Sequence, residues 1–131
     1  MIVHGKIFRL NHMDGFVAEK AGEKQGLITF QIDDNEMEIT SLNSFVENRG
    51  IGTSLVNRVI VLARNKLIRR IKLTTTNSNI NALRFWQKRE FHLFQIYPGA
   101  VEAARKQKPG IPLTDNNGIP IRDEIELEMV L

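Results

Sequence analysis

The chain of 131 residues has no cysteine, and this absence excludes a disulfide framework, a thiolate nucleophile and a cysteine-based zinc site. Its three histidines, His4, His12 and His92, lack the spacing of metal ligands, so we predict no metal centre. No apolar run approaches the roughly 18 residues that span a bilayer. The first residues do not resemble a signal peptide, because His4 and Lys6 interrupt them. We therefore predict a cytoplasmic protein with no membrane partner.

The chain also lacks a large excess of one charge, since its formal net charge is only +3. The basic residues form two small clusters: Arg69, Arg70 and Lys72, and later Arg105, Lys106 and Lys108. Neither cluster has interleaved aromatic residues, and the chain carries no nucleic-acid-binding motif. We expect solvated helix ends or contacts to an anionic cofactor there, and no nucleic-acid partner. The ordinary hydrophobic content of 42% predicts one globular domain over residues 1–131.

Two glycines mark the turn in residues 46–55 (Val-Glu-Asn-Arg-Gly-Ile-Gly-Thr-Ser-Leu), between a strand-like run and a helix-like run. Gly50 and Gly52 allow a close backbone approach, and the unpaired first-turn amides of a helix suit phosphate groups. A Walker loop would need a lysine after the last glycine, where Thr53 stands, and a Rossmann turn would need glycine in place of Leu55. A phosphate site and a plain glycine-containing helix start both stay open from these residues alone.

A second motif follows at residues 81–91 (Asn-Ala-Leu-Arg-Phe-Trp-Gln-Lys-Arg-Glu-Phe). It resembles the Asn-x-x-Ala-x-x-Phe-Tyr-x-x-x-Gly-Phe run of the GNAT superfamily of acetyl-CoA-dependent N-acetyltransferases. The pyrophosphate pattern of that family, Gln/Arg-x-x-Gly-x-Gly/Ala, maps onto Glu47, Gly50 and Gly52, with glutamate as a departure at the first position. The resemblance covers roughly residues 15–131, and the tail is similar to a small bacterial subgroup.

The resemblance implies an α+β fold, with a mixed, mostly antiparallel sheet, one parallel splayed strand pair and helices on both faces. Hydrophobic periodicity and turn residues predict the elements. A strand or irregular arm is expected over 2–10, and strands over 16–18, 26–32, 36–43, 71–76, 91–97 and 122–131. Helices are expected over 51–67, after 77–79 and over 100–107. The strand–helix–strand order around the first helix predicts a parallel pair.

Acetyl-CoA is the cofactor that the resemblance implies. Amides of the third strand's end would pair with its pantetheine arm, and the glycine turn would hold its diphosphate. Any of Asn77, Asn79 and Asn81 could serve as the N-cap of the second helix. The resemblance implies that Asn81 contacts the arm, with a plain cap as the alternative, and that Phe85 and Trp86 are core or cofactor wall. The implied cofactor-binding residues are Leu42, Asn43, Ser44, Asn48, Arg49, Gly50, Ile51, Gly52, Thr53, Asn77, Asn81, Phe85 and Trp86.

Glu38 is the predicted general base, and Glu36 is the second candidate. A period of two places Glu36, Glu38, Thr40 and Leu42 on one face of the third strand, opposite Met37 and Ile39. A solvent-facing Glu38 is the alternative, but the family often places a glutamate on this strand, and the attacking amine must lose a proton. The usual acid of the family is a tyrosine at the position of Trp86, which has no proton to supply. Tyr97 is the substitute that we predict.

The predicted reaction is acetyl transfer to a primary amine of a small-molecule or peptide acceptor, by direct attack in a ternary complex. Only 14 residues precede Gly15, where the family has a strand and two helices. The acceptor pocket is then open, or segment 99–121 or a second subunit completes it, so a homodimer is possible. Two other functions stay open: a catalytically inactive GNAT-like module that binds coenzyme A or regulates, and a basic nucleic-acid-binding domain.

Overall fold

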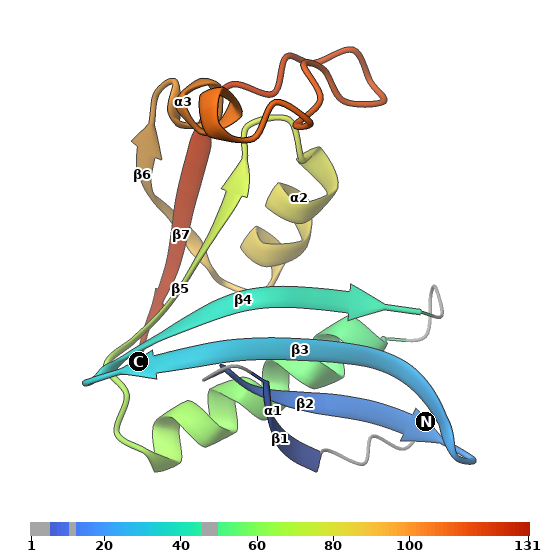
Figure 1. Ribbon diagram of the computed structural model, residues 1–131. Helices are drawn as coiled ribbons and strands as arrows, with labels where there is room; N and C mark the ends of the chain where they lie inside the picture. The colour runs from blue at the N-terminus through green and yellow to red at the C-terminus, as the bar shows by residue number, and fades with distance from the viewer. Residues whose placement is uncertain (1–5, 11–12, 46–49) are drawn as a thin grey trace. The chain divides into compact units, whose positions relative to one another are not determined.

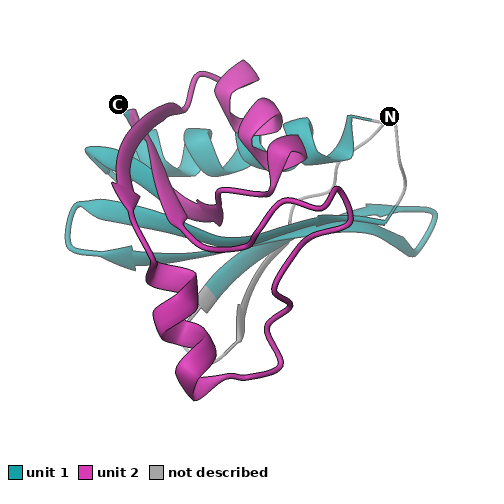
Figure 2. Cartoon of the chain, turned by 90° about the horizontal axis from the view of Figure 1, so that it is seen from above, with its two compact units in different colours: residues 1–72, 130–131 teal, residues 73–129 magenta. Residues whose placement is uncertain are grey.

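The computed structural model describes residues 6–10, 13–45 and 50–131, with side chains from residue 14 onward in these ranges (Figure 1). The chain forms two compact units, coloured separately in Figure 2. Unit 1 consists of residues 1–72 and 130–131, and unit 2 of residues 73–129. The predicted single domain over 1–131 stays a prediction. Within the described ranges, no helix has both the length and the apolar character that a membrane crossing requires.

Unit 1 begins with an antiparallel meander of four strands: β1 (Lys6–Leu10), β2 (Met13–Lys20), β3 (Glu23–Asp33) and β4 (Glu36–Ser44). Asp34 lies between the last two strands in the left-handed region, with φ 59°, which aspartate tolerates better than most residues. The helix α1 (Ile51–Asn65) then leads to β5 (Arg70–Thr76). These elements confirm the predicted strands over 16–18, 26–32 and 36–43 and the predicted first helix.

The pair formed by β4 and β5 is parallel. Within unit 1 its register joins Glu36 to Arg70, Met37 to Ile71 and Glu38 to Lys72. Parallel neighbouring strands need a crossover connection, which is usually an α-helix, and this is why the strand–helix–strand order predicts this geometry. The mostly antiparallel sheet with one parallel pair is therefore confirmed.

A β-bulge interrupts β4 at Thr40. Thr29 of β3 pairs with Ser41, whereas Phe30 pairs with Ile39, so Thr40 is an extra residue on β4. The Oγ1 of Thr29, which is almost fully buried, lies 2.7 Å from Thr40 Oγ1 and 2.6 Å from Ser41 Oγ. These two hydroxyl–hydroxyl hydrogen bonds across the bulge hold the bend in place.

The bulge corrects one prediction made from the strand's alternation. Met37 and Ile39 are buried and Glu38 is partly exposed, as the period of two predicts. Beyond the extra residue the alternation changes phase, so Leu42 pairs with the fully buried Ile28. Leu42 thus leaves the face of Glu38, and the prediction that they share a face is wrong.

Helix α1 contacts β2, β3 and β4 through its apolar stripe. The side chains buried along it are Ile51, Leu55, Val56, Val59 and Ala63. Leu67, the last residue of the helix predicted over 51–67, is 82% exposed. The helix ends at Asn65 and Leu67 has φ 58°, so its side chain no longer follows the helical period.

Unit 2 contains the remainder of β5, α2 (Ile80–Lys88), β6 (His92–Tyr97), α3 (Ala100–Gln107) and β7 (Glu124–Val130). Its strand order is β5-β7-β6, and β6 and β7 pair antiparallel. Trp86 makes edge-to-face contacts with Phe85 and Phe91 at centroid distances of 5.1 and 5.0 Å. Trp86, Phe91 and the fully buried Leu127 belong to the core of this unit, whereas Phe85 is partly exposed.

Candidate functional site

The start of α1 is built as an anion site would be. Gly50 occupies the N-cap position with φ 68° and ψ 18°, a left-handed conformation that favours glycine, and its carbonyl accepts a 3.0 Å bond from Ser54 N–H. Among the described residues, no side chain caps the helix and no acidic residue lies in its first turn. In the part of this turn that the structure describes, backbone amides and the positive end of the helix dipole therefore dominate the electrostatics.

Several predicted phosphate-binding residues belong to this turn. Ile51 is buried, whereas Gly52 and Thr53 are partly exposed at its surface. Asn48 and Arg49, together with Glu47, lie outside the described residues. The structure thus brings Gly50, Ile51, Gly52 and Thr53 to one helix start.

Gly26, which the sequence analysis did not single out, determines where that helix start lies. A Cβ on Gly26 would be 2.6 Å from Ile51 Cγ2, 2.9 Å from the carbonyl oxygen of Asn43 and 3.2 Å from Leu55 Cδ1. The absent side chain therefore lets α1 approach β3 and the end of β4 closely. A glycine inside a β-rich run was the available signal, because such a glycine often marks a close approach.

The end of β4 lies in the same unit. Leu42, Asn43 and Ser44 pair with Ile28, Leu27 and Gly26 of β3, respectively. Asn43 and Ser44 are exposed, and Leu42 is partly exposed. Through Gly26, the predicted arm-binding strand and the predicted phosphate turn are thus held against one another in unit 1.

The two glutamates of β4 differ in their surroundings. The Oε1 of Glu36 lies 3.6 Å from Arg70 and 3.6 Å from Lys72, so this carboxylate is paired with two cations. Within the described ranges, Glu38 forms no ion pair, and it sits opposite Gln31 of β3. Of the two, Glu38 is therefore the carboxylate available to accept a proton.

In unit 2, the start of α2 resolves the capping alternatives. Asn79 is the N-cap, and its Oδ1 accepts a 3.2 Å hydrogen bond from the backbone N–H of Ala82. Asn81, one of the alternatives, lies on the first turn with its side chain exposed. The amide of Asn81 therefore remains available for a ligand.

Asn77, the other alternative and a predicted cofactor contact, holds a loop. Its Oδ1 accepts hydrogen bonds from the backbone N–H groups of Arg122 and Asp123 at 3.0 and 2.9 Å. Its Nδ2 donates to the carbonyl of Pro120 at 2.9 Å. One amide hydrogen is left over, so the geometry assigns most of this side chain to the loop before β7.

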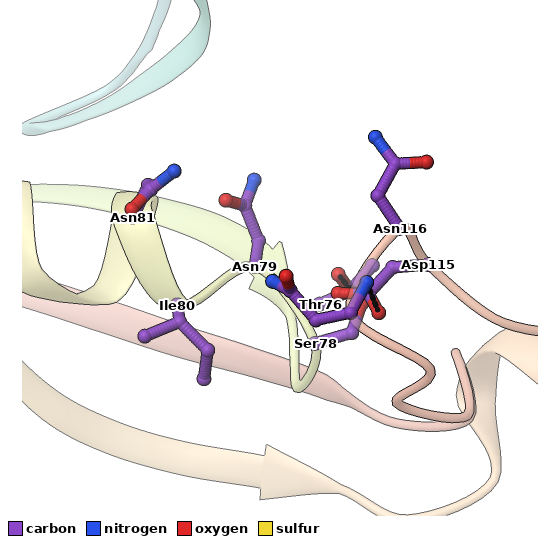
Figure 3. A pocket seen from close by; sticks show the side chains of 8 residues that line it. Thr76, Ser78, Asn79, Ile80, Asn81, Asp115 and Asn116 are labelled. Carbon is purple, nitrogen blue, oxygen red and sulfur yellow. Dashed lines mark hydrogen bonds between the residues drawn. The ribbon is translucent and has the colours of Figure 1, made fainter.

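A polar pocket of about 280 Å³ opens beside this loop, lined by residues 76, 78–81 and 115–117. Asn79, Asn81 and Asn116 extend to one side of the helix start, whereas Ile80 points the other way (Figure 3). At its base, Thr76 and the buried Ser78 join their hydroxyls at 3.1 Å. Segment 99–121 was one predicted candidate to complete the acceptor pocket, and this pocket beside α2 was not predicted.

The predicted acid, Tyr97, is engaged with β7. Its hydroxyl donates a 2.8 Å hydrogen bond to Oε1 of Glu126, which is only 8% exposed. Strict alternation of apolar and acidic residues along β7 would place Glu126 on an open face, but the structure buries it. A strand flanked by β5 and β6 has less open surface than a half-buried terminal strand, and the tyrosine satisfies the buried carboxylate. Trp86, also buried, lies in the core rather than at a surface.

The family model described as the acetyltransferase (GNAT) family matches residues 3–91. The chain belongs to the GNAT acetyltransferase family. The chain is also similar to two proteins from Bacillus subtilis (strain 168), the uncharacterized proteins YdhI and YxbD. YdhI is 47% identical over the whole chain and 82% of its own length. YxbD is 44% identical over 97% of the chain and 80% of its own length.

Solved GNAT structures share the fold. A GNAT family acetyltransferase from Elizabethkingia anophelis with acetyl-CoA bound is 28% identical, with a TM-score of 0.79 over 92% of this chain and 77% of its own. A Bacillus subtilis acetyltransferase in complex with CoA has a TM-score of 0.80 at 23% identity, over 93% of this chain and 79% of its own. These similarities confirm the α+β GNAT fold that the two sequence motifs implied.

Proposed function

We propose that this GNAT protein is an N-acetyltransferase that moves an acetyl group from acetyl-CoA to a primary amine of a small-molecule or peptide acceptor. The observation that carries the proposal is the start of α1, where a left-handed glycine opens a helix that no described side chain caps. That turn occurs in a chain of a family whose Elizabethkingia anophelis member binds acetyl-CoA. The attack is direct, within a ternary complex.

The residues of unit 1 fit the diphosphate and the arm of coenzyme A. The first-turn amides from Gly50 to Thr53 suit a dianionic group, since no acidic side chain of the described first turn opposes it. We assign the diphosphate to this turn, with Asn48 and Arg49 as further proposed contacts. The backbone of Leu42, Asn43 and Ser44 is proposed to pair with the pantetheine amides as an added strand would.

In unit 2 we propose contacts from Asn81, whose side chain is exposed, and from Phe85, which is partly exposed. Arg89 stacks over the Phe85 ring at 3.7 Å and donates to its backbone carbonyl at 2.8 Å, which fixes that side chain. Trp86 supports this wall from the core. Asn77 contributes to cofactor binding through its remaining amide hydrogen or through the loop that it holds.

Acetyl-CoA supplies the activated acetyl thioester, and Glu38 removes the proton that the amine must lose. Such an amine has a pKa of about 10.4 in model compounds and is mostly protonated near neutrality. We assign this role to Glu38 and not to Glu36, because Glu36 is already paired with Arg70 and Lys72. Glu38 takes the proton directly or through water. General-base assistance of this kind contributes about a hundred- to ten-thousand-fold to the rate.

Tyr97 is the proposed proton donor to the leaving thiolate. Its hydrogen bond to Glu126 fixes the orientation of the hydroxyl. A thiolate whose thiol has a pKa of about 8.5 is also a tolerable leaving group without assistance. The proposed reaction therefore depends on Tyr97 less than on Glu38.

A catalytically inactive module that binds coenzyme A is the second candidate. It is favoured by the buried Trp86, which stands where the family pattern has tyrosine, and by the commitment of the Tyr97 hydroxyl to Glu126. We place either form of the protein in the bacterial cytoplasm. A homodimer is proposed as well, since Leu93 and Ile96 of the edge strand β6 are more than half exposed.

Two measurements on the whole chain test these alternatives. Calorimetric titration with acetyl-CoA should show binding, and free thiol should then appear when amines such as spermidine or lysine-containing peptides are added. Binding without thiol release from any amine would support the inactive module. A chain that ignores acetyl-CoA at millimolar concentration would refute both proposals.

A further inference from the structure

We propose that the hairpin formed by residues 113–121 is part of the cofactor site, and that Asn116 and Asn117 hydrogen-bond the neutral pantetheine arm of acetyl-CoA. This inference rests on the proposed function, and it assigns to the tail of the chain a binding role that neither sequence motif contains. The hairpin is held firmly at both its base and its tip.

Two side chains outside the hairpin fix its base. Arg105 of α3 donates to three backbone carbonyls, those of Ile111 at 3.2 Å, Pro112 at 2.9 Å and Ile121 at 2.7 Å. Asn77, just after β5, holds residues 120–123 through its side chain. A long irregular loop with this many side-chain-to-backbone bonds is pre-organised, and pre-organisation lowers the entropic cost of binding.

The tip of the hairpin is fixed in the same way. Thr114 and Pro120 form an antiparallel bridge, and Oδ1 of Asp115 accepts from the backbone N–H groups of Asn117 and Ile119 at 2.9 Å each. Gly118 takes the left-handed conformation, with φ 78°, that closes the turn. Asp115 is thus occupied with the turn itself.

Asn116 and Asn117 have no comparable structural task. Both side chains are exposed, and within the described part of the chain neither makes a hydrogen bond. Both line the pocket that Asn79 and Asn81 of α2 also line, and Asn116 extends to the same side as those two amides (Figure 3). The hairpin therefore presents two amides to the helix start that carries a proposed cofactor contact.

The chemistry of the lining selects one portion of the cofactor. Amides and hydroxyls predominate and one carboxylate is present, and among the described residues no lysine or arginine lines the pocket. A diphosphate would find no described cation there, whereas the pantetheine arm has secondary amides that both donate and accept, as asparagine does. At about 280 Å³ the pocket is also below the usual range for a whole drug-sized ligand, so it accommodates a segment.

The test compares acetyl-CoA with adenosine 3′,5′-bisphosphate, its nucleotide half without the arm. In Asn116→Ala and Asn117→Ala, calorimetry should show the Kd of acetyl-CoA raised about two- to tenfold in each, the loss of one net hydrogen bond. The Kd of the bisphosphate should stay unchanged. Thr114→Ala is the matched control, because this exposed residue belongs to the same hairpin but does not line the pocket, and it should bind both ligands as wild type does.

Three results would overturn the inference while leaving the proposed function intact. One is an unchanged acetyl-CoA Kd in both asparagine variants. Another is equal weakening of acetyl-CoA and the bisphosphate, which would place the nucleotide half at the hairpin. The third is a raised KM for the amine at constant acetyl-CoA Kd, which would assign the hairpin to the acceptor. Failure of the wild-type chain to bind acetyl-CoA would instead refute the proposed function and this inference together.

Discussion

Replacing Gly26 by alanine should destabilise the chain through a single methyl group. The added Cβ would lie 2.6 Å from Ile51 Cγ2 and 2.9 Å from the carbonyl oxygen of Asn43. The isoleucine side chain can rotate or shift, but the carbonyl belongs to a β-strand and cannot move without disturbing its ladder. Overpacking of this kind costs about 1–3 kcal/mol. For a chain of this size that loss corresponds to a fall in Tm of roughly 4–12 °C.

The same substitution should weaken acetyl-CoA binding, because the crowded atoms belong to proposed cofactor contacts. Either α1 moves away from β3, which displaces the first-turn amides, or the Asn43 carbonyl moves, which displaces the proposed arm-binding strand. Gly110→Ala is the matched control, since a Cβ there meets no heavy atom within 4 Å. It should melt within a few degrees of wild type.

Scanning calorimetry and titration with acetyl-CoA decide the matter. A Gly26→Ala protein with the Tm and the acetyl-CoA Kd of wild type would show that α1 does not approach β3 as closely as the structure has it. A fall in Tm as large in Gly110→Ala would show that the effect comes from losing a glycine in general, and not from the close approach.

Three other substitutions have definite expected outcomes. Glu38→Gln should leave acetyl-CoA binding intact and lower kcat about a hundred- to ten-thousand-fold; unchanged turnover would remove Glu38 from the role of base. Gly52→Trp should abolish acetyl-CoA binding by calorimetry, because its side chain would cover the first-turn amides, and retained affinity would contradict the phosphate assignment. Asn77→Ala should lower the free energy of unfolding by about 1–3 kcal/mol in urea, since three hydrogen bonds to the loop are lost. The exposed Asn57→Ala should change it little.

The elements that depend on local pattern could be predicted from the sequence. The hairpin turn at 33–35 follows from side chains that bond their own backbone, and the stripe of α1 follows from the helical period. Helix α3 was predicted with the same bounds, 100–107, that the structure has. In each case the residues that decide the structure are neighbours in the chain.

Features that depend on a partner strand could not be predicted. The bulge at Thr40 arises from two hydroxyl hydrogen bonds to Thr29, a residue eleven positions away. The burial of Glu126 depends on Tyr97, twenty-nine positions away. Strict alternation assumes an uninterrupted ladder and one open face, and neither assumption holds for these strands.

The candidate site divides along the same line. The glycine turn is local, so Gly50 and Gly52 could be recognised from the sequence. The role of Gly26, which is to allow α1 to approach β3 closely, becomes visible only when α1 is packed on it. Asn77, Asn79 and Asn81 are equivalent as caps in sequence. Only the loop at 120–123, which lies more than forty residues further on, separates the anchor Asn77 from the cap Asn79.

The surroundings of Tyr97 and Trp86 bear on how the thiolate departs. The indole of Trp86 lies in the core and supplies no proton. The phenol hydroxyl of Tyr97 already donates a hydrogen bond to the Glu126 carboxylate. To protonate a thiolate, the phenol would have to give up this charge-assisted bond and leave a buried carboxylate with one donor fewer, which is unfavourable. Because a thiolate is itself a tolerable leaving group, we expect removal of the amine proton to limit the reaction more than protonation of the leaving sulfur. Catalysis should accordingly depend on Glu38 far more steeply than on Tyr97.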